Sequence, residues 1–191
     1  MHPDLIIAFV KEDRKKLKKA YKKITALNGY TKGLKKDVFI TLKKLKEDYI
    51  DTGHHYVQVL DYLREIARCL TFIIEPLYEH VENNHATTIP EQTKELNELS
   101  QGMKELFGKI LNIIETNDFE SVSTVITMNN KLLEKIERIT VLQVKLIKSE
   151  KIGTRNSMVI FNLLTETKNL ALHSVNVLKS HRDFYLRNGL R

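Results

Sequence analysis

Apolar residues recur every three or four positions along almost the whole chain, and polar residues occupy most positions between them. This spacing is typical of one face of an α-helix, whereas a half-buried strand alternates apolar and polar residues. Only three prolines and seven glycines interrupt the pattern. The pattern therefore predicts an all-α fold, and no segment of the chain favours a strand.

Breaks in the pattern divide the chain into six predicted helices. The LNGYTKG stretch ends the first helix, Gly53 opens the third, and the KIGTRN stretch precedes the sixth. We expect these helices at residues 4–28, 32–49, 54–83, around 96–113, around 119–146, and 154–187.

Two prolines carry further information about these helices. Pro76 lies inside the pattern of the third helix and should kink or shorten it, because proline lacks a backbone N–H. Before Pro90, Thr88 can cap the fourth helix while Glu91 reaches back, as in a capping box. We therefore expect the TTIPE stretch to start the fourth helix.

The third and sixth predicted helices have similar apolar stripes when the chain is laid on itself at an offset of 100 residues. The matched positions are Val59, Leu60, Leu63, Leu70 and Leu77 with Val159, Ile160, Leu163, Leu170 and Val177. A duplicated three-helix unit would keep the apolar register in this way. We expect two tandem units, at residues 4–85 and 88–188, packed as an elongated bundle.

The same alignment places polar residues on the sixth helix where the third helix is apolar. Ile66, Ala67, Ile73 and Ile74 correspond to Glu166, Thr167, His173 and Ser174, which we call the polar seam. A buried polar group without a partner costs on the order of 1–3 kcal/mol, so these residues need partners. A wider groove, a wet seam, a bond from a neighbouring helix, a polar or metal site, or a partner's docking groove would each satisfy them.

Basic residues are concentrated near the start of the chain. Residues 1–46 contain fourteen Lys or Arg and four Asp or Glu, a net charge of +10, whereas residues 47–191 have a net charge of −3. Residues 1–30 form a basic leader and first helix. Its densest part, which we call the basic collar, consists of Lys11, Arg14, Lys15, Lys16, Lys18, Lys19, Lys22 and Lys23.

Three explanations compete for the basic collar. It is the solvated side of a helix whose apolar stripe includes Leu17 and Ile24, or it faces anionic lipid headgroups, or it contacts nucleic acid. A nucleic-acid-binding domain would spread cations over a folded face with aromatic residues nearby, but Tyr21 is the only aromatic residue inside this segment. We therefore expect no nucleic-acid partner, and a charge confined to one end favours a membrane surface.

The rest of the composition predicts a soluble, intracellular, non-catalytic chain. The single cysteine, Cys69, excludes an intrachain disulfide, and the longest apolar run near the start has six residues, too short for a membrane span. No glycine-rich phosphate loop, GxSxG or HExxH motif is present, and Cys69 has no activating histidine nearby in sequence. Because one cysteine and dispersed histidines do not form a zinc set, we expect no metal and no cofactor, with His80 and His85 at the surface.

Two segments resemble the marked part of the third helix in each half of the PhoU family of phosphate-transport regulators. They are LREIARCLTFI, from Leu63 to Ile73, and KNLALHSVNV, from Lys168 to Val177, which keeps His173 and Asn176 in the family's positions. We add Asn176 to the polar seam for this reason. The family holds metal clusters through acidic residues, and the corresponding positions here are Arg64, Arg68, Lys168 and Leu172. The resemblance therefore implies the PhoU-like bundle without its metal sites.

Longer stretches, including TGHHYVQVLDYLREIARCLTFI and EHVENNH, are similar to the PhoU-like tail of bacterial sodium/phosphate cotransporters. This resemblance implies a regulatory domain on the cytoplasmic face of the inner membrane. Its partners would be the transporter's membrane domain, expected in the same polypeptide, and the anionic membrane surface, and homodimerisation stays open. The alternative is a free-standing PhoU-like adaptor that regulates phosphate uptake through an ABC importer and a sensor kinase.

Overall fold

The computed structural model describes residues 1–43, 50–86 and 88–187, and every regular element in these ranges is helical. This confirms the predicted all-α bundle. The elements are α1 (His2–Val10), α2 (Arg14–Leu42), α3 (Ile50–Glu82), α4 (Pro90–Thr116), a 3-10 turn (Phe119–Ser121), α5 (Val122–Lys148) and α6 (Thr154–Arg187).

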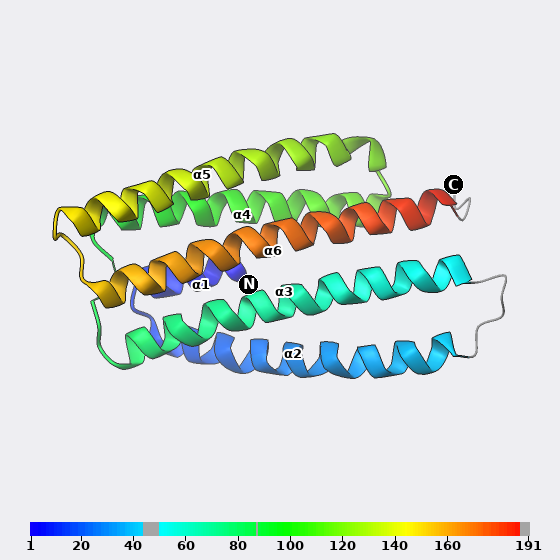
Figure 1. Cartoon of the computed structure of the whole chain (residues 1–191), viewed down its shortest axis with the longest axis horizontal. Coiled ribbons are helices and arrows are strands. Elements are labelled where there is room, and N and C mark those ends of the chain that lie inside the picture. Colours follow the sequence, from blue (N-terminus) through cyan, green and yellow to red (C-terminus); the bar gives the residue numbers. More distant parts are fainter. Residues whose placement is uncertain (44–49, 87, 188–191) are drawn as a thin grey trace.

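Five long helices lie side by side along the length of the bundle, and the short α1 packs against α4, α2 and α3 (Figure 1). The most extensive packing joins α3 to α6, with α2 on the free side of α3 and with α5 and α4 beside α6. Helix α1 packs mainly on α4 and also contacts α2 and α3. The first helix of the chain thus connects the two halves.

The buried apolar residues form one cluster to which all six helices contribute. Leu5, Ile6 and Phe9 of α1 are almost fully buried in it, together with Leu17 and Ile24 of α2. Because this core runs through both halves, the division into units at 4–85 and 88–188 stays a prediction. Residue 188 lies outside the described residues.

The matched positions of α3 and α6 differ in burial at two places: at Leu63 and Leu163, and at Leu77, which is buried, and Val177, which is half-buried. Leu60 and Ile160 are both buried, as are Leu70 and Leu170, but Leu63 is 38% exposed whereas Leu163 is fully buried. The expected equivalence of Leu63 and Leu163 is therefore wrong. Helix α6 is covered by α3, α4 and α5. Helix α3 is flanked by α2, by α6 and by the nine-residue α1, which meets α3 at its C-terminal end, where Phe9 packs on His80, and not at Leu63.

The predicted first helix at 4–28 is wrong, because the chain breaks at Lys11–Asp13. Glu12 has a positive φ of 53°, and the Asp13 carboxylate accepts a hydrogen bond from the Lys16 backbone N–H at 3.0 Å. Asp13 thereby caps a new helix, α2, and this hydrogen bond holds the pKa of its carboxyl below the ordinary value. Apolar residues keep the helical period across the break, so the pattern could not reveal it.

The predicted boundary at LNGYTKG is also wrong, because α2 continues through Gly29 and Gly33. Glycine weakens a helix by about 1 kcal/mol, but Thr31 is buried and Leu27 packs against the core. Tertiary packing therefore outweighs the local propensity. The last part of the predicted second helix, residues 44–49, lies outside the described residues.

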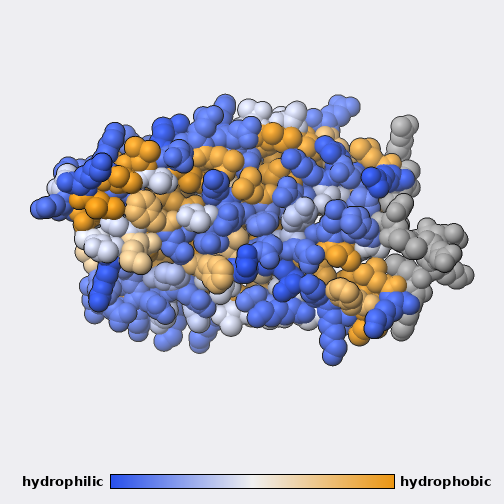
Figure 2. Space-filling model, in the orientation of Figure 1, coloured by the Kyte–Doolittle hydropathy of each residue, from blue (hydrophilic) through white to orange (hydrophobic). Residues whose placement is uncertain are grey.

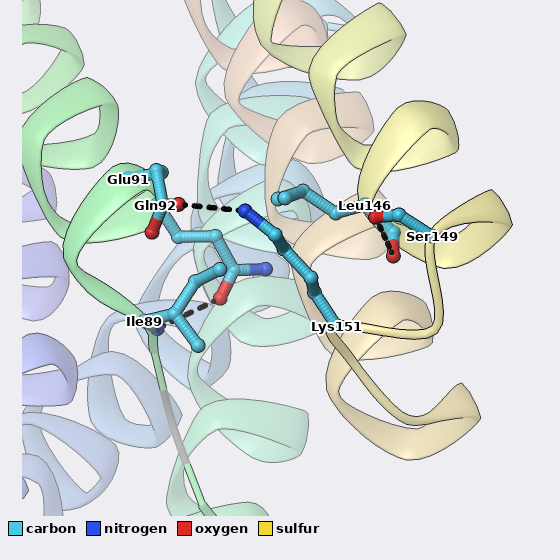
Figure 3. Close-up of polar contacts among 6 residues, drawn as sticks. All are labelled: Ile89, Glu91, Gln92, Leu146, Ser149 and Lys151. Atoms are coloured by element: carbon cyan, nitrogen blue, oxygen red, sulfur yellow. Dashed lines mark hydrogen bonds and ion pairs between the residues drawn. The ribbon is translucent and has the colours of Figure 1, made fainter.

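The two proline predictions have different outcomes. Pro76 does not shorten α3, which continues to Glu82. Pro90 begins α4 as expected, but the cap lies one residue later than predicted, since the Gln92 Oε1 accepts the Ile89 backbone N–H at 3.1 Å (Figure 3). Glu91 instead pairs with Lys151 at 3.2 Å.

Gln92 also centres a buried polar network between α4, α5 and α6. Its side chain is fully buried, and its Nε2 donates to the Gln143 Oε1 at 2.7 Å and to the Asn156 Oδ1 at 2.9 Å. The Asn156 amide in turn donates to the Ala86 carbonyl at 3.3 Å. These bonds hold together the end of the bundle at which the three helices meet.

Replacing Gln92 with alanine is expected to lower the free energy of unfolding by about 2 kcal/mol, because it leaves buried polar partners unsatisfied. Urea unfolding followed by circular dichroism measures the change. Gln101→Ala is the matched control, because Gln101 is exposed and bonds only Glu105 on its own helix. Equal effects of the two substitutions would contradict a structural role for the network.

Candidate functional site

All eight residues of the basic collar are exposed, and they lie around the first turns of α2 and just before it. Leu17 and Ile24 are fully buried on the opposite side of α2. Lys15, Lys18 and Lys22 follow the spacing of a single outward helix face. The structure therefore brings seven of the eight collar residues together on α2 at the edge of the bundle, and Lys11 lies just before this helix (Figure 1).

Acidic residues neutralise only a small part of the collar among the described residues. Arg14 pairs with Glu82 at 2.7 Å, and Lys16 pairs with Asp13 at 3.0 Å. No described ion pair engages Lys15, Lys18 or Lys22. The whole of α2 contains ten Lys or Arg and one acidic residue, so its outer face is a strongly positive surface.

A second row of the collar lines a groove between α1 and α2. The groove has a volume of about 420 Å³, and its walls include Lys16, Lys19 and Lys23 together with Asp4 and Ala20. The collar therefore presents cations on two adjacent sides of α2.

The polar seam does not form one open cluster, because its members meet different partners. The Thr167 Oγ1 lies 2.8 Å from the Nε2 of His2, and both residues are buried. The Ser174 Oγ donates to the Leu170 carbonyl of its own helix at 2.8 Å. Hydrogen bonds within the chain thus satisfy Thr167 and Ser174.

The remaining seam residues, Glu166, His173 and Asn176, are half-buried along α6. Glu166 and His173 face α3. The His173 ring lies 6.2 Å from the Tyr62 ring, and its Nδ1 is buried without a hydrogen bond. Glu166 accepts a hydrogen bond from the thiol of Cys69. Asn176 lies one turn beyond His173. A docking role for the seam stays a prediction.

Cys69 is poorly suited to act as a nucleophile. It is almost fully buried in the core of α3, and this burial raises the pKa of its thiol from 9.0 to about 12. The hydrogen bond to Glu166 and the negative charge of Glu166 act in the same direction. The thiolate, which is the reactive form, is therefore rare near neutral pH.

His80 and His85 stand at one end of α3, next to the start of α6. His80 is buried, contrary to the expected surface position, because its ring packs against Phe9 and its Nε2 bonds the Ala86 carbonyl at 2.8 Å. His85 is half-buried, and its Nε2 lies 2.8 Å from the Nη1 of Arg155. In the described ranges, no three His, Cys, Asp or Glu side chains are grouped to hold a metal ion.

Two features of the structure were absent from the sequence-based prediction. His2 is one, since a histidine beside the chain start gives no sign of burial. The other is a second group of cations after the collar, at Lys32, Lys35, Lys36 and Lys43, which meets Arg64 of α3. The lysine spacing in KGLKKDVFI could have indicated this group, but the contribution of Arg64 depends on the packing of α2 against α3.

No protein-family model, curated protein or solved structure matches the chain. Among the described residues, no helix has an apolar stretch of the length that a membrane crossing requires. The fold and surface therefore define an all-helical bundle with one strongly basic edge.

Proposed function

We propose that the chain is a non-catalytic, PhoU-like regulatory domain of a sodium-dependent phosphate cotransporter. It acts at the cytoplasmic face of the inner membrane, where its basic collar faces anionic lipid headgroups. The half-buried seam residues Glu166, His173 and Asn176, together with exposed helix faces, contact the transporter's membrane domain and bias transport.

The observation that carries this proposal is the exposure of the whole basic collar along the start of α2, at the bundle edge. Clustered Lys and Arg side chains gain about 1 kcal/mol each near an anionic membrane surface. A helix face that only meets water would not need such an excess of basic over acidic residues, because the two kinds usually alternate on exposed helices. The resemblance of the segment around Leu63 to the PhoU-like tail, and of the segment around His173 to the PhoU family, supplies the link to phosphate transport.

Sodium-driven uptake of labelled phosphate tests the regulatory role in cells that carry the native locus. A variant with Lys15, Lys18, Lys19 and Lys22 replaced by glutamine is expected to alter uptake at constant transporter abundance, because the domain loses its hold on the membrane. The matched control replaces four exposed lysines of α4 and α5, Lys104, Lys131, Lys145 and Lys148, by glutamine. Uptake should then equal that of the native chain.

Unchanged uptake in the collar variant would overturn the proposal. A collar variant that leaves sodium-driven uptake intact but alters the output of a phosphate-sensing kinase would instead favour the free-standing adaptor. Membrane spans encoded in frame upstream of Met1 are expected if the domain belongs to a cotransporter.

A further inference from the structure

The C-terminal half of α2 and the facing side of α3 form a second positively charged feature, separate from the collar. It is a groove of about 430 Å³, which we call the cationic groove, lined by Lys32, Lys35, Lys36, Phe39, Ile40, Lys43 and Arg64. Figure 2 shows an orange, apolar patch bordered by blue, hydrophilic atoms over this end of α2. The groove thus combines charge with an apolar floor.

Among the described residues, most cations of this groove have no ion-pair partner. Lys35 approaches Asp61 at 3.7 Å, but no described ion pair engages Lys32, Lys36, Lys43 or Arg64. Like charges gathered around one concave surface raise its potential and attract counter-ions. A phosphate group relieves this repulsion, and Arg64 can bind two of its oxygens at once.

The floor of the groove is unusual for a site that binds a free anion. Phe39 is 49% exposed and Ile40 is 47% exposed, and the Lys35 ammonium lies 5.9 Å from the centre of the Phe39 ring. A small soluble phosphate would leave both apolar side chains in water. Basic residues beside exposed aromatic and aliphatic side chains are instead typical of helices that lie in a membrane interface.

The position of the groove on α2 agrees with this interpretation. Lys18 of the collar and Lys36 of the groove are 18 residues apart, which is five full helical turns, so they project from the same side of α2. At 1.5 Å per residue the two lysines are separated by about 27 Å along the helix axis. Lys22 and Ile40 have the same relation. One flat surface can therefore contact both the collar and the groove.

We propose that the cationic groove binds the phosphate of an anionic phospholipid, while Phe39 and Ile40 enter the acyl boundary of the bilayer. This inference rests on the proposed membrane location and adds a specific lipid site to it. The collar supplies long-range attraction, and the groove supplies the contact that holds α2 in the interface.

The chain contains no tryptophan, so a single introduced indole reports on one position. Phe39→Trp is expected to shift its fluorescence to shorter wavelength with phosphatidylglycerol vesicles and to stay unchanged with phosphatidylcholine vesicles. Ile40→Trp serves as a second reporter in the groove. Leu111→Trp is the matched control, because Leu111 is 57% exposed on α4, away from α2, and should not shift.

Charge removal then tests the phosphate contact. Lys36→Gln with Arg64→Gln should weaken binding to phosphatidylglycerol vesicles about 30-fold, a factor of about five for each charge. Lys104→Gln with Lys131→Gln removes the same charge from exposed positions of α4 and α5 and should change binding little. Circular dichroism and urea unfolding verify that each variant is folded.

The outcomes separate the groove from the wider function. Vesicle sedimentation without a fluorescence shift at positions 39 and 40 would overturn the groove site and leave collar-mediated membrane binding intact. An equal spectral change with glycerol phosphate and no vesicles would overturn the choice of a lipid. Absence of all vesicle binding would overturn the lipid site, whereas the regulatory role depends on the uptake experiment.

Discussion

Replacing Phe9 with alanine is expected to lower the free energy of unfolding by about 3–5 kcal/mol, the usual cost of removing a buried phenylalanine ring. Phe9 has no exposed surface, and its ring meets that of His80 with 5.8 Å between the centres. Helix α1 has only nine residues, too few to be stable without tertiary contacts. The substitution therefore loosens the helix that connects α4 with α2 and α3.

Urea unfolding followed by circular dichroism measures this loss. Phe39→Ala is the matched control, because it removes the same ring from a half-exposed position on α2 and should cost less than about 1 kcal/mol. If Phe9→Ala and Phe39→Ala had similar midpoints, α1 would contribute little to the core. The same measurement tests whether the fold tolerates the loss of the Phe39 ring from the cationic groove.

The apolar period was sufficient to predict the helical bundle and the bounds of its last helix. Helix α6 matches the predicted range of 154–187, and Pro90 starts α4 as expected. These predictions succeed because strong amphipathic periodicity and a proline at a helix start act locally.

The predicted helix boundaries are wrong where long-range packing, or a local cap that leaves the apolar period unchanged, decides the outcome. Gly29 and Gly33 favour a break, but burial of the side chains around them keeps α2 continuous. Conversely, the break at Glu12 depends on one residue with positive φ and on the Asp13 cap, neither of which disturbs the apolar period. A stripe of apolar residues indicates which side of a helix is buried more reliably than it indicates where the helix ends.

In the candidate site, too, local sequence predicted some features, whereas contacts between distant parts of the chain were missed. Exposure of the collar followed from the position of Leu17 and Ile24 on the opposite face, and the structure agrees with it. The partner of Thr167 could not be predicted, since His2 is 165 residues away in the chain. The cationic groove likewise needs Arg64 from α3, so the sequence of α2 alone contains only one wall of it.

Acid is expected to destabilise the protein through His2. Burial, and to a smaller extent the nearby N-terminal charge, lowers the pKa of His2 from 6.5 to about 3, so the ring stays neutral in the folded state. The unfolded chain binds a proton on this histidine near pH 6.5, and between pH 6.5 and 3 it therefore holds one proton more than the folded chain. The contribution of His2 to stability is complete above pH 6.5 and decreases as the pH falls, by about 1.4 kcal/mol per pH unit.

At pH 4.5 the titration of His2 is expected to lower the free energy of unfolding by about 2.7 kcal/mol relative to neutral pH. His2→Gln removes the titration while keeping an amide that can bond the Thr167 hydroxyl. Unfolding free energies measured from pH 7 to 4.5 should fall more steeply for the native chain than for His2→Gln, by the equivalent of about one proton. His54→Gln, at an exposed position, should follow the native curve. Parallel curves for the native chain and His2→Gln would show that His2 takes up a proton as readily in the folded state as in the unfolded chain. The ring that contacts Thr167 of α6 would then be charged at low pH, and the burial of His2 would not destabilise the protein in acid.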